Sequence, residues 1–398
     1  MRFLRLDKLQ QANPFLRRDY SRDFTGCEVP AALKLLRRDA TTLEAGFTAI
    51  RQRMAIPLDV LRAAYINLLD GRHLILYGPP GTGKTTLAEL MAEHLFGCDT
   101  DFQTAVSDWT PFETVGGLRL ALRDGHEELS PELGVITNSM LRCLNTIAEH
   151  GFSGGGPQGS WLVLDEINRA NMDSAFGQIF TALDPEHPTM SLPFFDAPRR
   201  RLVVPNRFRI IGTMNTYDKN FLFRMSYALT RRFALVPVDA PANSDEDGRQ
   251  DEVEKLWMNL QQSLKERCDL TYTVGELQAK YGDAVMRLLY DQLVTAIRAP
   301  GSTQPHGLGR GIGFAQIAAA LRHAVMSLEL GTVPSGDFIG ALDWAVRGAI
   351  LPQLEGLPSS QLGAFAKWWT TDANLQGMKV SLAGLDDLTR GLQLFQAG

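Results

Sequence analysis

The chain has 398 residues, of which 44% are hydrophobic and 21% charged, and its formal net charge is −5. This composition is typical of a globular protein that buries a sizeable core. The net negative charge argues against a protein whose whole surface binds nucleic acid, although a local basic pore is compatible with it.

Four scattered cysteines, at positions 27, 98, 143 and 268, form no CxxC pair and no His/Cys metal spacing. This pattern predicts reduced thiols. The first residues, MRFLRLDKLQ, do not resemble a signal peptide, and no apolar run approaches 18 residues. We therefore expect a soluble, cytoplasmic protein with no membrane partner.

In chain order, residues 1–56 have helical spacing around 31–38 and 43–53, and we interpret them as a short helical lead-in. Short apolar runs then alternate with helix-like stretches over residues 57–240, which predicts an α/β core with a parallel five-stranded sheet between helices. The predicted strands are residues 73–77, 104–106, 161–165, 208–214 and 233–238.

The polar, acidic segment 241–252 is predicted to be a linker. Residues 241–398 as a whole read as an α-helical lid and C-terminal region, with Gly/Pro-rich loops at 299–313 and 331–337. An amphipathic helix is expected over 252–267. His306, His323 and the Trp368–Trp369 pair are interpreted as core or surface residues, and segment 365–369 either covers apolar surface or contacts a partner.

The first predicted strand runs directly into a glycine-rich loop that ends in Lys84 and Thr85, and a helix-like segment, 86–95, follows. Glycines let successive backbone N–H groups point at phosphate oxygens, while the lysine reaches the β- and γ-phosphates and the hydroxyl of Thr85 can ligate Mg²⁺. The predicted nucleotide-binding residues are Gly78, Pro79, Pro80, Gly81, Thr82, Gly83, Lys84, Thr85, Thr86 and Asp165.

A second motif is the apolar strand WLVL followed by Asp165 and Glu166. Ligands of open α/β sheets sit at the carboxyl ends of the strands, so both carboxylates are expected there. We predict that Asp165 and Thr85 hold Mg²⁺, and that Glu166 accepts a proton from the attacking water.

A third strand, RIIGTMN, ends in Asn215, and Arg231 and Arg232 precede the fifth strand. Asn215 is a candidate for a hydrogen bond to the γ-phosphate or to the lytic water, which it would help Glu166 to orient, or alternatively a residue of a strand-terminal turn. The two arginines are either a solvated surface or arginine fingers that reach a neighbouring subunit's γ-phosphate.

Together these motifs resemble the AAA+ superfamily, and within it the McrB/MoxR/dynein-related branch. Segment 165–171 (DEINRAN) resembles the extended Walker B motif of McrB-type NTPases, and 212–218 (GTMNTYD) resembles their sensor-1 strand. Segment 228–233 (ALTRRF) resembles their arginine-finger motif, usually ALRRRF. Segments 109–117 and 134–141 resemble the hairpin insert in helix 2, and 341–356 resembles a recurring C-terminal segment.

The resemblance implies an AAA+ P-loop NTPase core, with Glu166, Asn215, Arg231 and Arg232 as catalytic residues. It also places Asn168 and Arg169 near the lytic water or the subunit interface. Thr230 replaces the first arginine of the usual triplet, which favours Arg232 over Arg231.

Two positions are left open by the resemblance. The sensor-2 arginine has no counterpart at the helix start expected near 311–317, where only Arg310 precedes and Arg322 follows. The base pocket is expected near residues 54–57, and no residue distinguishes ATP from GTP. Most relatives use ATP, so ATP with Mg²⁺ is the predicted cofactor and GTP the alternative.

The resemblance is compatible with several functions. We favour a ring-forming ATPase, hexameric by preference, that remodels or regulates a separate effector protein. The alternative is a DNA-translocating subunit of a McrB-like restriction system with a separate nuclease; residues 1–55 show no aromatic and basic base-reading patch to support it. A nucleotide-dependent scaffold without turnover is disfavoured by the intact Asp165, Glu166 and Asn215.

Overall fold

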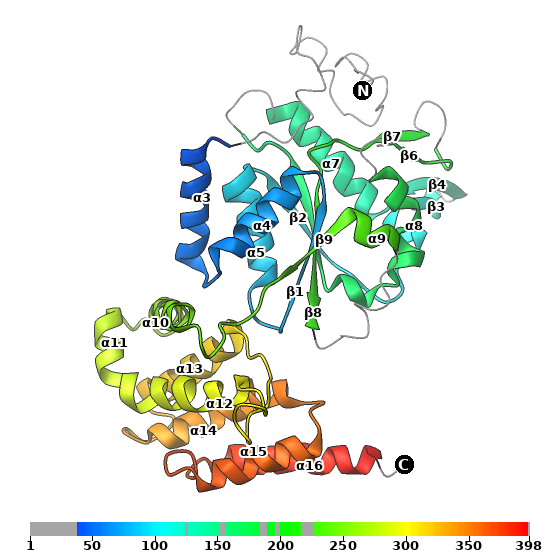
Figure 1. Cartoon of the computed structure of the whole chain (residues 1–398). Coiled ribbons are helices and arrows are strands. Elements are labelled where there is room, and N and C mark those ends of the chain that lie inside the picture. Colours follow the sequence, from blue (N-terminus) through cyan, green and yellow to red (C-terminus); the bar gives the residue numbers. More distant parts are fainter. Residues whose placement is uncertain are drawn as a thin grey trace. The chain divides into compact units, whose positions relative to one another are not determined.

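The computed structural model describes residues 38–123, 126–150, 156–183, 189–195, 200–216 and 227–396 (Figure 1). Its contacts define two compact units. The α/β unit contains the described residues up to Gln52 together with Pro57–Gly78 and Lys84–Val238. The helical unit contains Arg53–Ile56, Pro79–Gly83 and Asp239–Gly398. The stretch at 31–38, for which helical spacing was predicted, lies outside the described residues except for Arg38.

The α/β unit is built on a parallel five-stranded sheet of order β2-β5-β8-β1-β9, as predicted. The central strands are almost entirely buried because helices cover both faces, which explains their continuous apolar sequences. The strands are β1 (His73–Gly78), β2 (Asp99–Thr104), β5 (Ser160–Asp165), β8 (Ile210–Asn215) and β9 (Phe233–Pro237).

One predicted strand was misplaced. Residues 104–106 were expected to form a strand, but β2 ends at Thr104. This strand lies at the edge of the sheet, where three of its six residues are exposed and the other three partly exposed, and its sequence, DTDFQT, is polar. The apolar run at 104–106 therefore did not predict the position of β2.

Helices cover both faces of the sheet, with α4 and α5 on one side and α7 and α8 on the other (Figure 1). The helix after the phosphate loop begins at Lys84 and becomes π-helical at Met91. The helical segments are α3 (Ala40–Arg53), α4 (Leu58–Leu69), α5 (Lys84–Leu90), η1 (Met91–Phe96), α6 (Pro111–Thr114), α7 (Val135–His150), η2 (Ile167–Arg169), α8 (Met172–Ala182) and α9 (Tyr227–Arg232).

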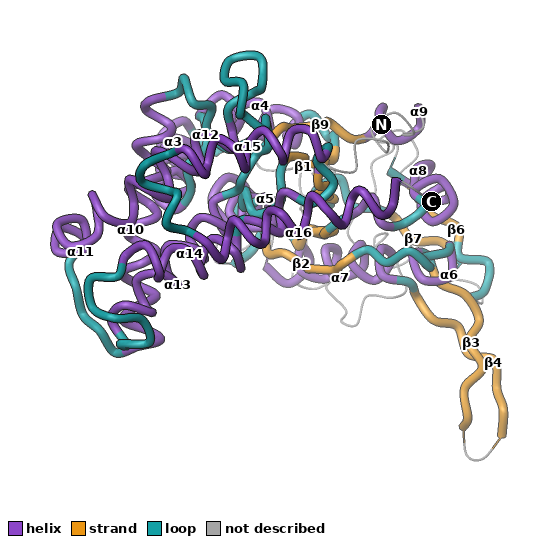
Figure 2. Tube along the Cα trace, turned by 90° about the horizontal axis from the view of Figure 1, so that it is seen from below, coloured by secondary structure: helices purple, strands orange, loops and turns teal. Residues whose placement is uncertain are grey.

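Two antiparallel hairpins accompany the central sheet. The larger pairs β3 (Gly116–Arg123) with β4 (His126–Leu133) and extends away from the rest of its unit (Figure 2). It begins at the end of segment 109–117 and ends just before segment 134–141, the two segments that resemble the helix-2 insert. The smaller hairpin pairs β6 (Thr189–Ser191) with β7 (Arg201–Val203).

The regular elements in the described part of the helical unit are all helices. Its elements are α10 (Glu246–Cys268), α11 (Val274–Tyr281), the π-helical η4 (Gly282–Val294), α12 (Thr295–Arg298), α13 (Phe314–Glu329), α14 (Phe338–Ala349), η5 (Leu351–Leu354), α15 (Ser359–Thr371) and α16 (Lys379–Gln396). None of the helices in the described ranges is long and apolar enough to cross a membrane.

The predicted linker at 241–252 is shorter than expected, because α10 already begins at Glu246. Asp245 caps this helix by accepting a hydrogen bond from the Gly248 N–H, and acidic residues fill the first turn. An acidic run at a helix N-terminus complements the helix dipole, so the same charges that suggested a linker stabilise a helix.

Phe365 and Trp369 are fully buried in the core of the helical unit, so this segment fills the interior. The indole N–H of Trp369 donates to the Leu375 carbonyl. Trp368 stacks on the ring of His306 with centroids 4.3 Å apart. These contacts agree with the interpretation of His306 and the tryptophans as structural residues.

Candidate active site

The glycine-rich loop follows β1 without a break. Gly81 and Gly83 have φ values of 75° and 83°, in the left-handed region that glycine adopts without strain. Lys84 begins α5 and is 6% exposed, and its Nζ donates to the Gly78 carbonyl at 3.1 Å. The lysine side chain is thus folded back along the loop. Thr86, two residues further along the chain, is exposed.

The carboxyl ends of three adjacent strands meet beside this loop. β1 pairs with β8 so that Gly78 lies opposite Asn215. β8 pairs in turn with β5, whose last residue is Asp165. Parallel strands bring their ends to one sheet edge, so residues far apart in the sequence become neighbours here.

Asp165 is held by two hydroxyl groups. Thr85 Oγ1 donates to Asp165 Oδ1 at 2.8 Å, and Thr213 Oγ1 donates to the same oxygen at 2.6 Å. Three oxygen-bearing side chains therefore converge, and a hydroxyl with a carboxylate is a donor set that suits Mg²⁺. The predicted pair Thr85 and Asp165 fits a magnesium ion.

Glu166 has a left-handed backbone, with φ 51° and ψ 46°. This conformation costs a non-glycine residue roughly 1–2 kcal/mol. Its carboxylate is engaged on both oxygens, because Asn215 Nδ2 donates to Oε1 at 3.3 Å and Arg169 forms an ion pair with Oε2. The strained backbone thus directs the side chain toward Asn215, at the end of the neighbouring strand.

Thr213 is a site residue that the sequence interpretation missed. Its hydroxyl donates to Asp165 and also accepts from the Glu166 N–H at 3.0 Å, so one buried side chain orients both acidic residues. The available signal was strand alternation: Thr213 lies two residues before Asn215, and residues i and i+2 point to the same face.

We expect Thr213→Val to lower the stability of the fold and to slow turnover. The change keeps the side-chain shape but leaves the partly buried Glu166 N–H without its acceptor, which costs about 1–3 kcal/mol. Thermal unfolding measures the first effect and phosphate release the second. Thr213→Ser retains the hydroxyl and should resemble the wild type; equal unfolding temperatures for the Val variant and the wild type would contradict this role.

The two predicted arginine fingers differ in their surroundings. Arg231 is exposed, whereas Arg232 is half-buried and its Nη1 donates to the Ala228 carbonyl at 3.1 Å. Arg232 also lies near His73: burial, aided by the charges of Arg209 and Arg232, holds the pKa of His73 well below its ordinary value. The exposure therefore favours Arg231, and not Arg232, for reaching another chain.

Neither candidate for the sensor-2 arginine lies at the start of α13. Gly313 caps this helix and Phe314 is its first residue. Arg310 donates to the backbone carbonyls of Gln353 and Glu355. Arg322 lies within the helix, and burial lowers its pKa.

The tip of the phosphate loop, Pro79–Gly83, is part of the helical unit. The Ala315 N–H donates to the Gly81 carbonyl at 2.9 Å. A side chain at Gly83 would come within 3.0 Å of the Met54 methyl group. Met54 lies in the segment 54–57, where we predicted the base pocket, and that pocket stays a prediction.

Comparison with protein families finds that residues 73–233 match the model of the AAA domain, dynein-related subfamily. The match begins at the first residue of β1 and ends at the first residue of β9, so it includes four of the five strands of the central sheet in full and the start of the fifth. It supports an AAA-type ATPase domain, which binds and hydrolyses nucleotide. A comparison with curated proteins found no match.

Proposed function

We propose that this chain is a Mg²⁺-dependent, ATP-hydrolysing AAA+ motor of the McrB-like branch, which acts as a hexameric ring on a separate effector protein. The observation that supports it best is the convergence of Lys84, Thr85, Asp165, Glu166 and Asn215 at one edge of the sheet. These residues belong to separate strands and helices, and their combination is the one that a phosphoryl-transfer site uses.

The residues divide the chemistry among themselves. The Gly78–Thr86 segment binds the phosphates, with the Lys84 ammonium near the β- and γ-phosphates. Thr85 and Asp165 hold Mg²⁺, which neutralises phosphate charge when bound. Glu166 takes the proton of the attacking water, and Asn215 and Arg169, which already contact its carboxylate, orient that carboxylate.

The exposed arginine supports a shared site in a ring. Arg231 belongs to α9, and its side chain lies on the surface of the described α/β unit. A guanidinium group that reaches a neighbour's γ-phosphate stabilises the charge of the transition state. We include Arg232 in the proposed pair, with Arg231 as the residue that makes the contact.

The β3–β4 hairpin supports a protein effector. Leu118, Leu120 and Leu122 alternate along β3, and Leu129 lies opposite Leu120 on β4. All four are exposed, Leu122 by 79%. Residues at alternate positions share one face of a hairpin, so they form a leucine face, and an exposed apolar face of this kind is typical of protein contact surfaces.

Phosphate release at increasing protein concentration tests the proposal. We expect release to require Mg²⁺, to favour ATP over GTP, and to rise more steeply than in proportion to the chain concentration, because the arginine of a second chain completes the site. An isolated monomer should bind nucleotide and hydrolyse it poorly. A constant rate per chain at all concentrations would refute the shared site, and stimulation by double-stranded DNA would favour the restriction alternative.

A further inference from the structure

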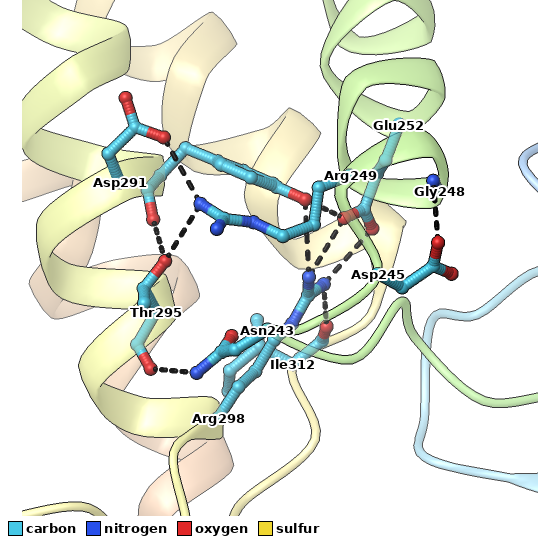
Figure 3. Close-up of polar contacts among 10 residues, drawn as sticks. Asn243, Asp245, Gly248, Arg249, Glu252, Asp291, Thr295, Arg298 and Ile312 are labelled. Atoms are coloured by element: carbon cyan, nitrogen blue, oxygen red, sulfur yellow. Dashed lines mark hydrogen bonds and ion pairs between the residues drawn. The ribbon is translucent and has the colours of Figure 1, made fainter. Parts of the chain in front are cut away.

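A buried ion pair lies in the helical unit, close in the fold to the tip of the phosphate loop. Glu252 of α10 and Arg298 of α12 have side chains that are 2% and 6% exposed. Arg298 donates through Nη1 to Oε2 at 2.8 Å and through Nη2 to Oε1 at 3.0 Å (Figure 3). A pair this deeply buried loses its hydration, and its attraction compensates only when the geometry is good. Such a pair adds little to the stability of the fold, and the contacts of Glu252 and Arg298 indicate another role for them.

Its surroundings hold the pair in one orientation. The Tyr290 hydroxyl donates to Glu252 Oε2, and the Tyr290 ring has the guanidinium groups of Arg249 and Arg298 at 5.5 and 5.6 Å from its centroid. Arg249 donates in turn to Asp291 and Thr295 (Figure 3). The Arg298 fork therefore has little freedom to turn.

The same fork binds a backbone carbonyl outside the ion pair. Arg298 Nη2 donates to the Ile312 carbonyl at 2.7 Å (Figure 3). Ile312 is 1% exposed and lies between Gly311 and Gly313. The ion pair thus fixes the position of a short backbone segment just before α13.

This segment lies directly against the phosphate loop. A Cβ atom at Gly313 would come within 2.3 Å of the Pro80 carbonyl oxygen, and one at Gly311 within 2.4 Å of the Pro79 ring. Only glycine at these two positions permits so close an approach to the loop, and at Gly313 the approach is to the loop backbone itself. At the second residue of α13, the Ala315 N–H donates to the Gly81 carbonyl.

We infer that Glu252 and Arg298 are positioning residues for the nucleotide: through the Ile312 carbonyl they hold residues 311–313 against residues 79–81, and so preset the phosphate loop. A glycine-rich loop has many conformations to lose on binding, and a loop already held in its bound shape loses fewer and binds more tightly. The inference rests on the proposed function, since it assigns the loop to nucleotide.

Gly313→Ala tests the close approach without disturbing the buried charges. The torsion angles of Gly313, φ −81° and ψ 165°, suit alanine, so the variant adds one methyl group against the loop and no backbone strain. Gly348→Ala in α14 is the matched control, because a Cβ atom there meets nothing within 4 Å. Titration with a fluorescent ATP analogue and Mg²⁺ gives the affinity, and thermal unfolding without nucleotide reports the fold.

We expect Gly313→Ala to bind the analogue at least about tenfold more weakly than the wild type, or ~1.4 kcal/mol. Gly348→Ala should bind like the wild type, and both variants should unfold cooperatively. Wild-type affinity in Gly313→Ala would overturn the inference while leaving the proposed function intact. Failure of the wild type itself to bind would instead defeat the proposed function, and the inference with it.

Arg298→Lys tests the ion pair. Lysine keeps the positive charge beside Glu252, but a single ammonium group cannot reproduce the planar fork that reaches two carboxylate oxygens and a carbonyl. A purely structural pair would lower the unfolding temperature and leave the affinity of the folded protein unchanged. We expect the affinity to fall as well; unchanged affinity in the folded variant would overturn the role of Arg298. If this variant does not fold, Gly313→Ala decides.

Discussion

Glu166→Gln is expected to abolish nucleotide turnover while leaving nucleotide binding intact. Glutamine has the size of glutamate and keeps a carbonyl oxygen toward Asn215, but it cannot accept the proton of the attacking water. Loss of a general base typically costs 10²–10⁴-fold in rate. The replacement also removes the charge that pairs with Arg169, so the variant should bind ATP at least as tightly as the wild type.

Steady-state phosphate release and titration with a fluorescent ATP analogue measure the two properties separately. Asp173→Asn is a matched control, because Asp173 is an acidic residue of the nearby helix α8 and lies outside the proposed site. It should hydrolyse ATP at the wild-type rate. Residual turnover within a few-fold of the wild type in Glu166→Gln would remove Glu166 from its proposed role. Because the inactive variant keeps its nucleotide, it is also suited to capturing the effector for identification.

Arg231→Ala is expected to lose turnover as severely, and to recover it when mixed with Glu166→Gln. Arginine fingers contribute about 10³–10⁵-fold in related phosphoryl-transfer sites. If Arg231 acts on a neighbouring chain, an interface that combines the arginine of one variant with the glutamate of the other is complete. Random mixing of equal amounts in a ring of identical interfaces restores about one quarter of them.

The measurement is phosphate release from each variant alone and from the mixture. An inactive mixture of two variants that still assemble would show that the arginine acts within its own chain or not at all. Arg232→Ala provides the comparison: because Arg232 is half-buried and bonded to the Ala228 carbonyl, its loss should lower the unfolding temperature, and the loss of turnover should be smaller than for Arg231. The reverse order would restore the preference that the sequence pattern gave to Arg232.

Much of the candidate site followed from local patterns. A glycine-rich loop between a strand and a helix, and an apolar strand ending in two acids, each predict where their residues lie along the chain. The meeting of Asp165 with Thr85 then follows from one rule, since parallel strands present their carboxyl ends at the same edge. The parallel sheet itself was predictable because buried strands must be apolar along their whole length.

Features that do not follow from the meeting of strand ends at one sheet edge were missed. β2 was misplaced because an edge strand half open to solvent needs no apolar run. Thr213 is one hydroxyl residue in an apolar strand, and only the register of β5 beside β8 shows that it serves both acids. The contrast between Arg231 and Arg232 depends on how α9 packs, because adjacent residues on a helix point in different directions.

The sequence by itself determined the chemistry of the phosphate loop and of the strand-end acids, since these functions need particular residue types at close spacing. Only the tertiary structure decided what holds the loop. Glu252, Arg298 and Ile312 are separated along the chain and carry no shared motif, and their contact exists because the fold brings α10, α12 and the segment before α13 together. A short motif specifies its own backbone. The burial of the Glu252–Arg298 pair and the close approach of Gly311 and Gly313 to the phosphate loop arise only when distant segments are brought together.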